Sequence, residues 1–187
     1  MEKKLNIPII IGTSRVNRES IKPAKLIAEI GQSIAEISVS LVDPLDFNLP
    51  NDGNDEGFKD SKYTEITKAA DGFIIVTPEY NHSYSGSLKR LLDSELENYI
   101  HKPVAFAGVS STPWGGVRAI EALVNTVREM GLSASFTDLY FPMVQTLFNM
   151  EGKILDHKYE SRIKKFYGEL IWLAKIFKYG RANLAKA

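Results

Sequence analysis

Apolar runs that suit buried strands alternate along this chain with segments in which apolar residues recur at helical spacing. The predicted strands are residues 6–11, 38–43, 72–77, 103–109 and 132–140. The predicted helices are residues 20–37, 58–71, 85–93, 116–130 and 158–179. Continuous β-branched runs are typical of strands that are covered on both faces. The alternation of the two element types therefore predicts an α/β protein, with a parallel sheet between two layers of helices.

Several segments begin or end at residues that favour starts, stops and turns. Ser20 is the expected N-cap of the first helix, and Gly131 is suited to end helix 116–130. Residues 44–57 are polar and rich in Asn, Asp and Gly, which predicts a long surface loop. Because no linker or repeat divides the chain, we expect one domain over residues 1–187.

The order of the strands follows from the connections between them. Right-handed crossovers leave few arrangements for five parallel strands, and 2-1-3-4-5 is the expected order of this doubly wound sheet. Ligands of such sheets bind beyond the carboxyl ends of the strands, where the strand order reverses. This rule nominates three loops, residues 12–20, 77–86 and 110–116, which are also the loops with unusual residues.

Composition excludes several classes of protein to which the chain could otherwise belong. Lys and Arg together number 23, as do Asp and Glu, so no net charge draws the chain to nucleic acid or to a membrane surface. The absence of cysteine excludes disulfides, thiolate nucleophiles and Cys-ligated metals. The chain has no signal-like start and no apolar run near the ~18 residues of a membrane span, so we expect a cytoplasmic protein.

The first nominated loop, residues 12–20, has the composition of an anion pocket between a strand and a helix N-terminus. It lacks the Gly-x-Gly-x-x-Gly and Gly-Lys-[Ser/Thr] patterns, which leaves a terminal phosphate monoester as the expected ligand. The groups that could bind it are the hydroxyls and amides of Thr13, Ser14 and Ser20 and the guanidiniums of Arg15 and Arg18. The alternative is an ordinary loop with solvated arginines.

The other two loops could face a planar ligand. Tyr80 follows the buried strand 72–77 closely, so its ring is expected at the mouth of the sheet, with Asn81 beside it as donor and acceptor. Gly115 and Gly116 precede a helix, where paired glycines let the backbone approach a ligand. The alternative for residues 77–86 is a surface turn, and the alternative for residues 110–116 is a tight turn before a helix.

Other kinds of site find little support. The histidines are dispersed, at positions 82, 101 and 157, so no metal site is expected. The sequence has no nucleophile elbow for acyl transfer. Asp43 and Asp46 follow the second strand and are expected to lie away from the crevice.

Three segments together resemble the NAD(P)H-dependent FMN reductase family, which has a flavodoxin-like fold and includes quinone, azo-dye and chromate reductases. They are residues 12–20, residues 77–81 with 86–93, and residues 115–119, and the resemblance extends to about residue 145. Its most specific part is Pro-Glu-Tyr-Asn followed by Gly-x-Leu-Lys. Ser85 and Arg90 depart from the family pattern, in which proline and asparagine are common at these positions.

The resemblance implies a binding site for FMN. It assigns the phosphate to Thr13, Ser14, Arg15, Arg18 and Ser20. It places Pro78, Glu79, Tyr80 and Asn81 at the isoalloxazine, mostly through backbone groups, and Ser110, Gly115 and Gly116 at its pyrimidine end. It further implies a dimer in which a second subunit helps to complete the crevice, and we expect a homodimer or homotetramer.

The expected activity follows from the cofactor. NAD(P)H would pass a hydride to FMN and leave, and a small oxidant would then take its place in a ping-pong cycle, so no catalytic side chain is expected. Free flavins, quinones, azo compounds and metal ions are the expected oxidants. The alternatives are a flavodoxin-like electron carrier or regulatory module that does not oxidise NAD(P)H, and a flavin-free interaction protein. The balanced charge argues against a carrier, since dedicated carriers are usually acidic.

Overall fold

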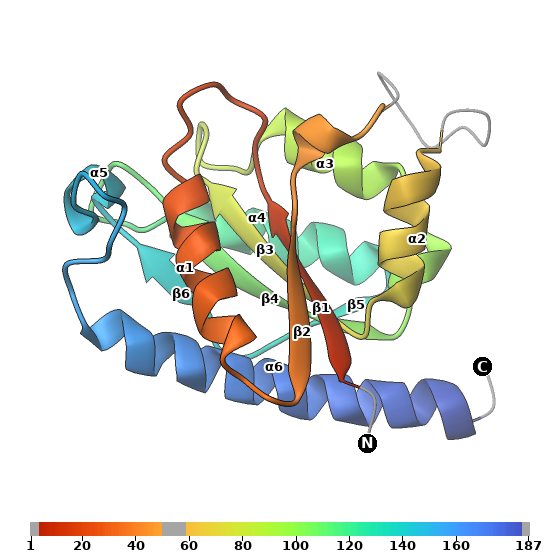
Figure 1. Ribbon diagram of the computed structural model, residues 1–187. Helices are drawn as coiled ribbons and strands as arrows, with labels where there is room; N and C mark the ends of the chain where they lie inside the picture. The colour runs from red at the N-terminus through yellow and green to blue at the C-terminus, as the bar shows by residue number, and fades with distance from the viewer. Residues whose placement is uncertain (1–3, 50–58, 185–187) are drawn as a thin grey trace.

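A computed structural model describes residues 4–49 and 59–184, which form a parallel sheet flanked by helices (Figure 1). The strands are β1 (Leu5–Ile11), β2 (Ile37–Val42), β3 (Phe73–Pro78), β4 (Lys102–Val109), β5 (Leu132–Ala134) and β6 (Leu139–Phe141). Their order is β2-β1-β3-β4-β5, with β6 also paired to β4. The predicted order is confirmed, and the sheet has a sixth strand that the sequence did not predict.

Each of the five predicted helices is present, with shifted ends. They are α1 (Ile21–Gln32), α2 (Ser61–Ala69), α3 (Gly86–Asp93), α4 (Val117–Glu129), α5 (Val144–Leu147) and α6 (Lys158–Asn183), with 3₁₀ turns η1 (Pro44–Asp46) and η3 (Glu97–Tyr99). The short α5 was not predicted, and α6 continues beyond its predicted end. The predicted loop 44–57 contains η1, and its part from residue 50 lies outside the described residues. Within the described parts of the chain, no helix is long and apolar enough to span a bilayer.

The two faces of the sheet carry separate apolar cores. In β1, Ile9 and Ile11 face the core that is shared with α1 and α6, whereas Ile10 faces the core that is shared with α2, α3 and α4. This alternation follows from the two-residue period of a strand. Figure 1 shows the long α6 running across one side of the sheet, with α1 on the same side. The core on the α1 and α6 side reaches the carboxyl ends of β1 and β4, where Ile11 and Val109 are buried, and the loops that follow these strands lie beyond it.

The predicted strand 132–140 is interrupted. β5 pairs with β4 up to Ala134, opposite Val104, and β6 resumes the pairing at Leu139, opposite Ala107. Between these two pairs, the edge segment advances five residues along the chain while β4 advances three. Residues 135–138 therefore bulge from the sheet. Edge strands commonly carry such bulges, which disfavour pairing with another sheet.

Asp138 in this bulge is expected to make folding dependent on pH. Burial, opposed by a hydrogen bond from Tyr140, raises the pKa of Asp138 to about 6, and its Oδ1 is buried without a partner among the described residues. Because the folded pKa lies above the unfolded one, stability falls as pH rises from about 4 to about 6 and is constant above that range. We expect Asp138→Asn to stabilise the protein at pH 7.5 by roughly 1–2 kcal/mol, since partial solvent contact weakens the effect.

Urea unfolding at pH 4.5 and pH 7.5 measures this difference. The gain from Asp138→Asn should be smaller at pH 4.5, where the native carboxyl is mostly protonated. Asp46→Asn is the control, because Asp46 is exposed. A gain of equal size at both pH values would contradict the assignment.

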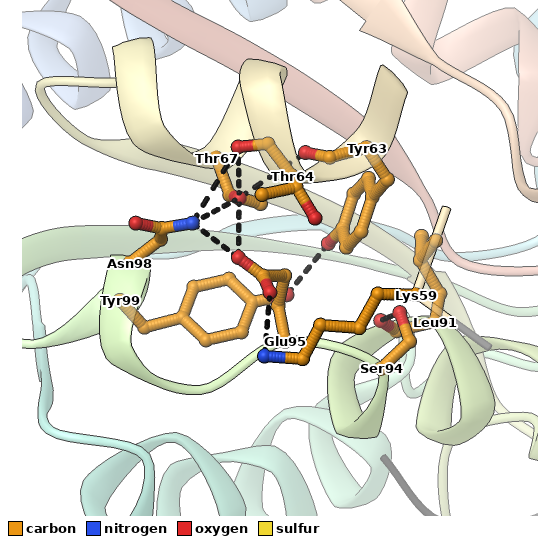
Figure 2. Close-up of polar contacts among 9 residues, drawn as sticks. All are labelled: Lys59, Tyr63, Thr64, Thr67, Leu91, Ser94, Glu95, Asn98 and Tyr99. Atoms are coloured by element: carbon orange, nitrogen blue, oxygen red, sulfur yellow. Dashed lines mark hydrogen bonds and ion pairs between the residues drawn. The ribbon is translucent and has the colours of Figure 1, made fainter. Parts of the chain in front are cut away.

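A second buried carboxylate, that of Glu95, joins α2 to the segment between α3 and β4. Its side chain is 3% exposed and accepts hydrogen bonds from Thr67 Oγ1 at 3.1 Å and from Asn98 Nδ2. Lys59 Nζ lies 3.6 Å from Oε1. Figure 2 shows these three side chains pointing at the carboxylate. The network lies before the start of β4, at the opposite edge of the sheet from the nominated loops.

Candidate functional site

The three nominated loops leave one edge of the sheet, because β1, β3 and β4 are neighbours and parallel. Gly12 N donates to Val76 O at 2.7 Å, which carries the pairing of β1 and β3 into the first loop. Glu79 N donates to Val109 O at 3.0 Å and does the same for the second loop. The convergence predicted from the strand order is therefore present, and side-chain contacts join the loops further.

Thr13 and Tyr80 connect the first two loops. Thr13 is buried, and its Oγ1 lies 3.1 Å from Tyr80 Oη, within hydrogen-bond distance. The same oxygen accepts a hydrogen bond from Arg15 N at 3.2 Å. The Tyr80 ring therefore extends toward the first loop, so the expected phosphate seat and the expected ring platform are adjacent.

Two serines extend this connection. Ser85 Oγ donates to Gly12 O at 2.6 Å and accepts from Leu88 N, as the N-cap of α3. Ser87 Oγ accepts from Ser14 N at 3.1 Å and lies 3.0 Å from Ser85 Oγ, to which it donates because the Ser85 proton is already used. Ser85, where the family pattern favours proline, thus ties the first loop to α3. Neither contact was predicted from the sequence.

The two arginines of the first loop have different surroundings. Arg18 Nη1 donates to Thr13 O at 2.9 Å and to Asp43 Oδ1 at 3.1 Å, and Nη2 forms a second contact with the same carboxylate. Arg15 is exposed and has no ion-pair partner among the described residues. The expectation that Asp43 lies away from the crevice was wrong, because β2 ends beside β1 and brings Asp43 against the first loop. Arg15 is therefore the cation that remains available to an anion.

Ser20 stands where the first loop enters α1. It occupies the predicted N-cap position, but its φ of −62° and ψ of −15° are helical and its side chain makes no capping bond. The hydroxyl is buried and has no hydrogen-bond partner among the described residues. A buried hydroxyl is normally paired, so this unpartnered oxygen at a helix N-terminus is a feature that a phosphate ligand would explain.

The second loop contains a tight two-residue turn. Tyr80 and Ser83 exchange backbone hydrogen bonds of 2.7 and 2.9 Å. Between them, Asn81 and His82 have φ values of 48° and 64°, as a type I′ turn requires. Both side chains are exposed, while Pro78 and Tyr80 lie half-buried at the sheet. The turn fixes the direction of the backbone that was expected to face a planar ligand.

The third loop is held by its own serine. Ser110 Oγ donates to Thr112 O at 2.7 Å and accepts from Gly115 N at 2.9 Å. Gly115 and Gly116 have φ values of 64° and 83°, which favour glycine. A Cβ on Gly116 would lie 2.5 Å from Val109 N, so the loop packs on β4 at a distance that only glycine permits.

An ion pair crosses from the second loop to the helix that follows the third. Arg118 Nε and Nη2 both lie 2.7 Å from Glu79 Oε1, and the Glu79 side chain is 7% exposed. Sequence reasoning placed Glu79 at the ring through its backbone and did not identify Arg118. A basic residue two positions after paired glycines was a visible signal, but nothing in the sequence named its partner.

Among residues 4–49 and 59–184, no group of three His, Asp or Glu side chains is placed to hold a metal ion.

Three joined loops at the carboxyl edge of a sheet of order 2-1-3-4-5 define a flavodoxin-like α/β protein. The sequence profile of the NADPH-dependent FMN reductase family matches residues 5–142, and the chain belongs to that family.

Curated relatives carry related names. The chain is 32% identical over 124 residues to an NADPH azoreductase of Bacillus sp. (strain OY1-2), a match that covers 64% of this chain and 66% of the relative. It is 35% identical over 127 residues to an FMN-dependent NADPH-azoreductase of Staphylococcus aureus, which covers 60% of this chain and 66% of the relative. The chain thus spans just under two thirds of the length of these relatives.

Solved structures support the fold. The flavoenzyme NAD(P)H:(acceptor) oxidoreductase FerB from Paracoccus denitrificans superposes with a TM-score of 0.75 at 20% identity, over 91% of this chain and 98% of FerB. RosB, solved with 8-demethyl-8-formylriboflavin-5′-phosphate, superposes with a TM-score of 0.72 at 15% identity, over 93% of this chain and 80% of RosB. At these identities the likeness establishes the architecture alone.

Proposed function

We propose that this chain binds FMN at the three-loop site and acts as an NAD(P)H-dependent oxidoreductase toward small-molecule oxidants. The first loop carries the proposal. Among the described residues, Arg15 has no ion-pair partner there and the buried Ser20 hydroxyl has no hydrogen-bond partner, in a chain that belongs to this family. Both groups suit the terminal phosphate of FMN, and α1 adds the positive end of its dipole. Thr13, Ser14 and Arg18 complete the proposed seat.

The residues of the protein itself are proposed to bind FMN and to orient its ring. Pro78, Glu79, Tyr80 and Asn81 are proposed to face the ring, and Ser110, Gly115 and Gly116 to close its pyrimidine end. FMN, when bound, would supply the redox chemistry, by accepting a hydride from NAD(P)H and delivering its two electrons to the oxidant. The side chains therefore need no acid–base role, and their contribution is a fixed geometry with backbone donors near the ring.

The oxidants that suit such a site are free flavins, quinones, azo compounds and metal ions. The azoreductase names of the relatives favour azo compounds among them. Stopped-flow mixing of the FMN-loaded protein with NADPH, and separately with NADH, tests the proposal through the loss of flavin absorbance. A flavin that stays oxidised for seconds with both would instead support an electron carrier, and a protein without FMN affinity would support the flavin-free alternative.

We also propose that the chain works in the cytoplasm as a homodimer or homotetramer. On α6, Trp172, Ile176 and Tyr179 are exposed and share one helix face by their spacing. An exposed apolar stripe of this kind supports association with a second copy. Sedimentation equilibrium of the full chain measures the assembly state, with and without FMN.

Replacing Arg15 with alanine is expected to weaken FMN binding by about 1.5–3 kcal/mol, which is roughly 10- to 150-fold in Kd. The reason is the loss of a charge-assisted hydrogen bond that no other described cation of the first loop can replace, since Arg18 already pairs with Asp43. Quenching of FMN fluorescence on titration measures the Kd. Arg128→Ala, near the far end of α4, is the matched control. Equal affinities for both variants would rule out the phosphate assignment.

A further inference from the structure

The contact between Arg118 and Glu79 joins a partly exposed guanidinium to a buried carboxylate. Two nitrogens of one guanidinium converge on Oε1, each at 2.7 Å. The Glu79 side chain is 7% exposed, whereas that of Arg118 is 40% exposed. A carboxylate so far removed from water requires a partner charge, and removing that partner leaves an uncompensated buried charge. Arg118 therefore offsets the energetic cost of burying the Glu79 carboxylate.

The pair spans the two loops that were expected to flank the ring. Glu79 follows β3 directly, and its N donates to Val109 O at the end of β4. Arg118 is the second residue of α4 and follows the close-packed Gly116 by two positions. One ion pair thus fixes the start of the second loop to the helix that begins where the third loop ends.

Only one of the two carboxylate oxygens of Glu79 is paired within the described part of the chain. Glu79 Oε2 is buried and has no hydrogen-bond partner among the described residues. Within the described parts of the chain, the ion pair of Glu79 is with Arg118. The net charge of the pair itself is zero with both residues present, negative without Arg118, and positive without Glu79.

We propose that Arg118 and Glu79 form a positioning pair that holds the ring-facing loops together and keeps this edge of the flavin site electrically neutral, which sets the reduction potential of bound FMN. The proposal rests on the proposed function, because it assumes that the ring lies between these loops. Negative charge develops near N1 and O2 of the flavin on reduction, so an uncompensated Glu79 would oppose reduction and an uncompensated Arg118 would favour it.

Three variants test the sign of the effect. Arg118→Met should weaken the binding of reduced FMN about tenfold relative to oxidised FMN, which lowers the potential by ~30 mV for a two-electron couple. Glu79→Gln should shift the potential in the opposite direction. The double variant Arg118→Met/Glu79→Gln should return it toward the wild-type value, since the net charge is again zero. Equilibration with a reference dye measures the potential, and FMN titrations give the Kd of the oxidised form.

A conservative variant separates charge from geometry. Arg118→Lys keeps the charge but loses the planar fork, so it should leave the potential near the wild-type value while raising the Kd for oxidised and reduced FMN together. Lys164→Met, in the exposed pair of Lys164 with Glu160, is the matched control and should change neither quantity. Thermal melting without FMN reports whether each variant folds, and Glu79→Gln with the double variant carries the test if Arg118→Met does not fold.

The outcomes distinguish this inference from the proposed function. A lower potential in Arg118→Met together with a higher one in Glu79→Gln supports the pair as the determinant of the potential, and the reverse directions overturn the inference. Shifts of the same sign, or none, with FMN bound and reduced by NADPH, overturn the inference and leave the proposed function intact. A wild-type protein that binds no FMN overturns the proposed function itself.

Discussion

Replacing Glu95 with alanine is expected to lower the free energy of unfolding by about 3 kcal/mol. The carboxylate is buried, and Thr67, Asn98 and Lys59 all direct donors at it (Figure 2). Thr67 Oγ1 can still donate to Tyr63 O, but the Asn98 amide loses its charged acceptor, and the truncated side chain leaves a cavity. Urea unfolding, followed by circular dichroism, measures the change from the midpoint and slope.

Two further variants isolate the buried charge. Glu95→Gln should cost only about 1 kcal/mol, since its amide oxygen still accepts from Thr67 and Asn98 and the lost partner, Lys59, is 36% exposed. Glu36→Ala removes a pair with Lys175 in which both side chains are more than half exposed, and it should change stability by less than ~0.5 kcal/mol. An alanine variant at position 95 as stable as the one at position 36 would contradict the assigned role. FMN affinity should be unchanged, because the network lies at the opposite edge of the sheet.

The sheet could be predicted from the sequence because burial on both faces leaves a strong signal. The strands 72–77 and 103–109 read as continuous apolar runs, and every residue from Phe73 to Thr77 is buried. The interruption of strand 132–140 could not be predicted in the same way. Whether Phe136 belongs to a strand or to a bulge depends on the register of this segment against β4. The local pattern of apolar and polar residues does not determine that register.

The candidate site likewise has features that could be predicted from the sequence and features that could not. The three loops were found because the strand order places them at one edge, a rule that needs only topology. The ion pairs of Arg18 with Asp43 and of Arg118 with Glu79 join residues 25 and 39 positions apart, and each depends on the lengths of the intervening elements. Without coordinates, a charged residue near a loop has many possible partners. Sequence reasoning therefore identified the loops and missed the contacts that hold them.

Replacing Gly116 with alanine is expected to lower the free energy of unfolding by about 4 kcal/mol and to abolish high-affinity FMN binding. The φ of 83° strains any L side chain, and the new Cβ would lie 2.5 Å from Val109 N and 2.8 Å from Gly108 Cα. These neighbours are backbone atoms of a central strand, so the third loop must move away from β4. Ser110 and Gly115 would move with it, which opens the proposed pyrimidine end of the site. Urea unfolding and FMN titration measure the two losses.

Gly152 provides the matched control, because its φ of 79° is nearly the same while nothing lies within 4 Å of a Cβ placed there. Gly152→Ala should therefore cost only the backbone strain, about 1 kcal/mol, and leave FMN affinity unchanged. The difference between the two variants isolates the contact of the third loop with β4 from the strain that both share. Equal losses of stability would show that strain alone accounts for the effect. Unchanged FMN affinity in a folded Gly116→Ala protein would remove the third loop from the proposed flavin site.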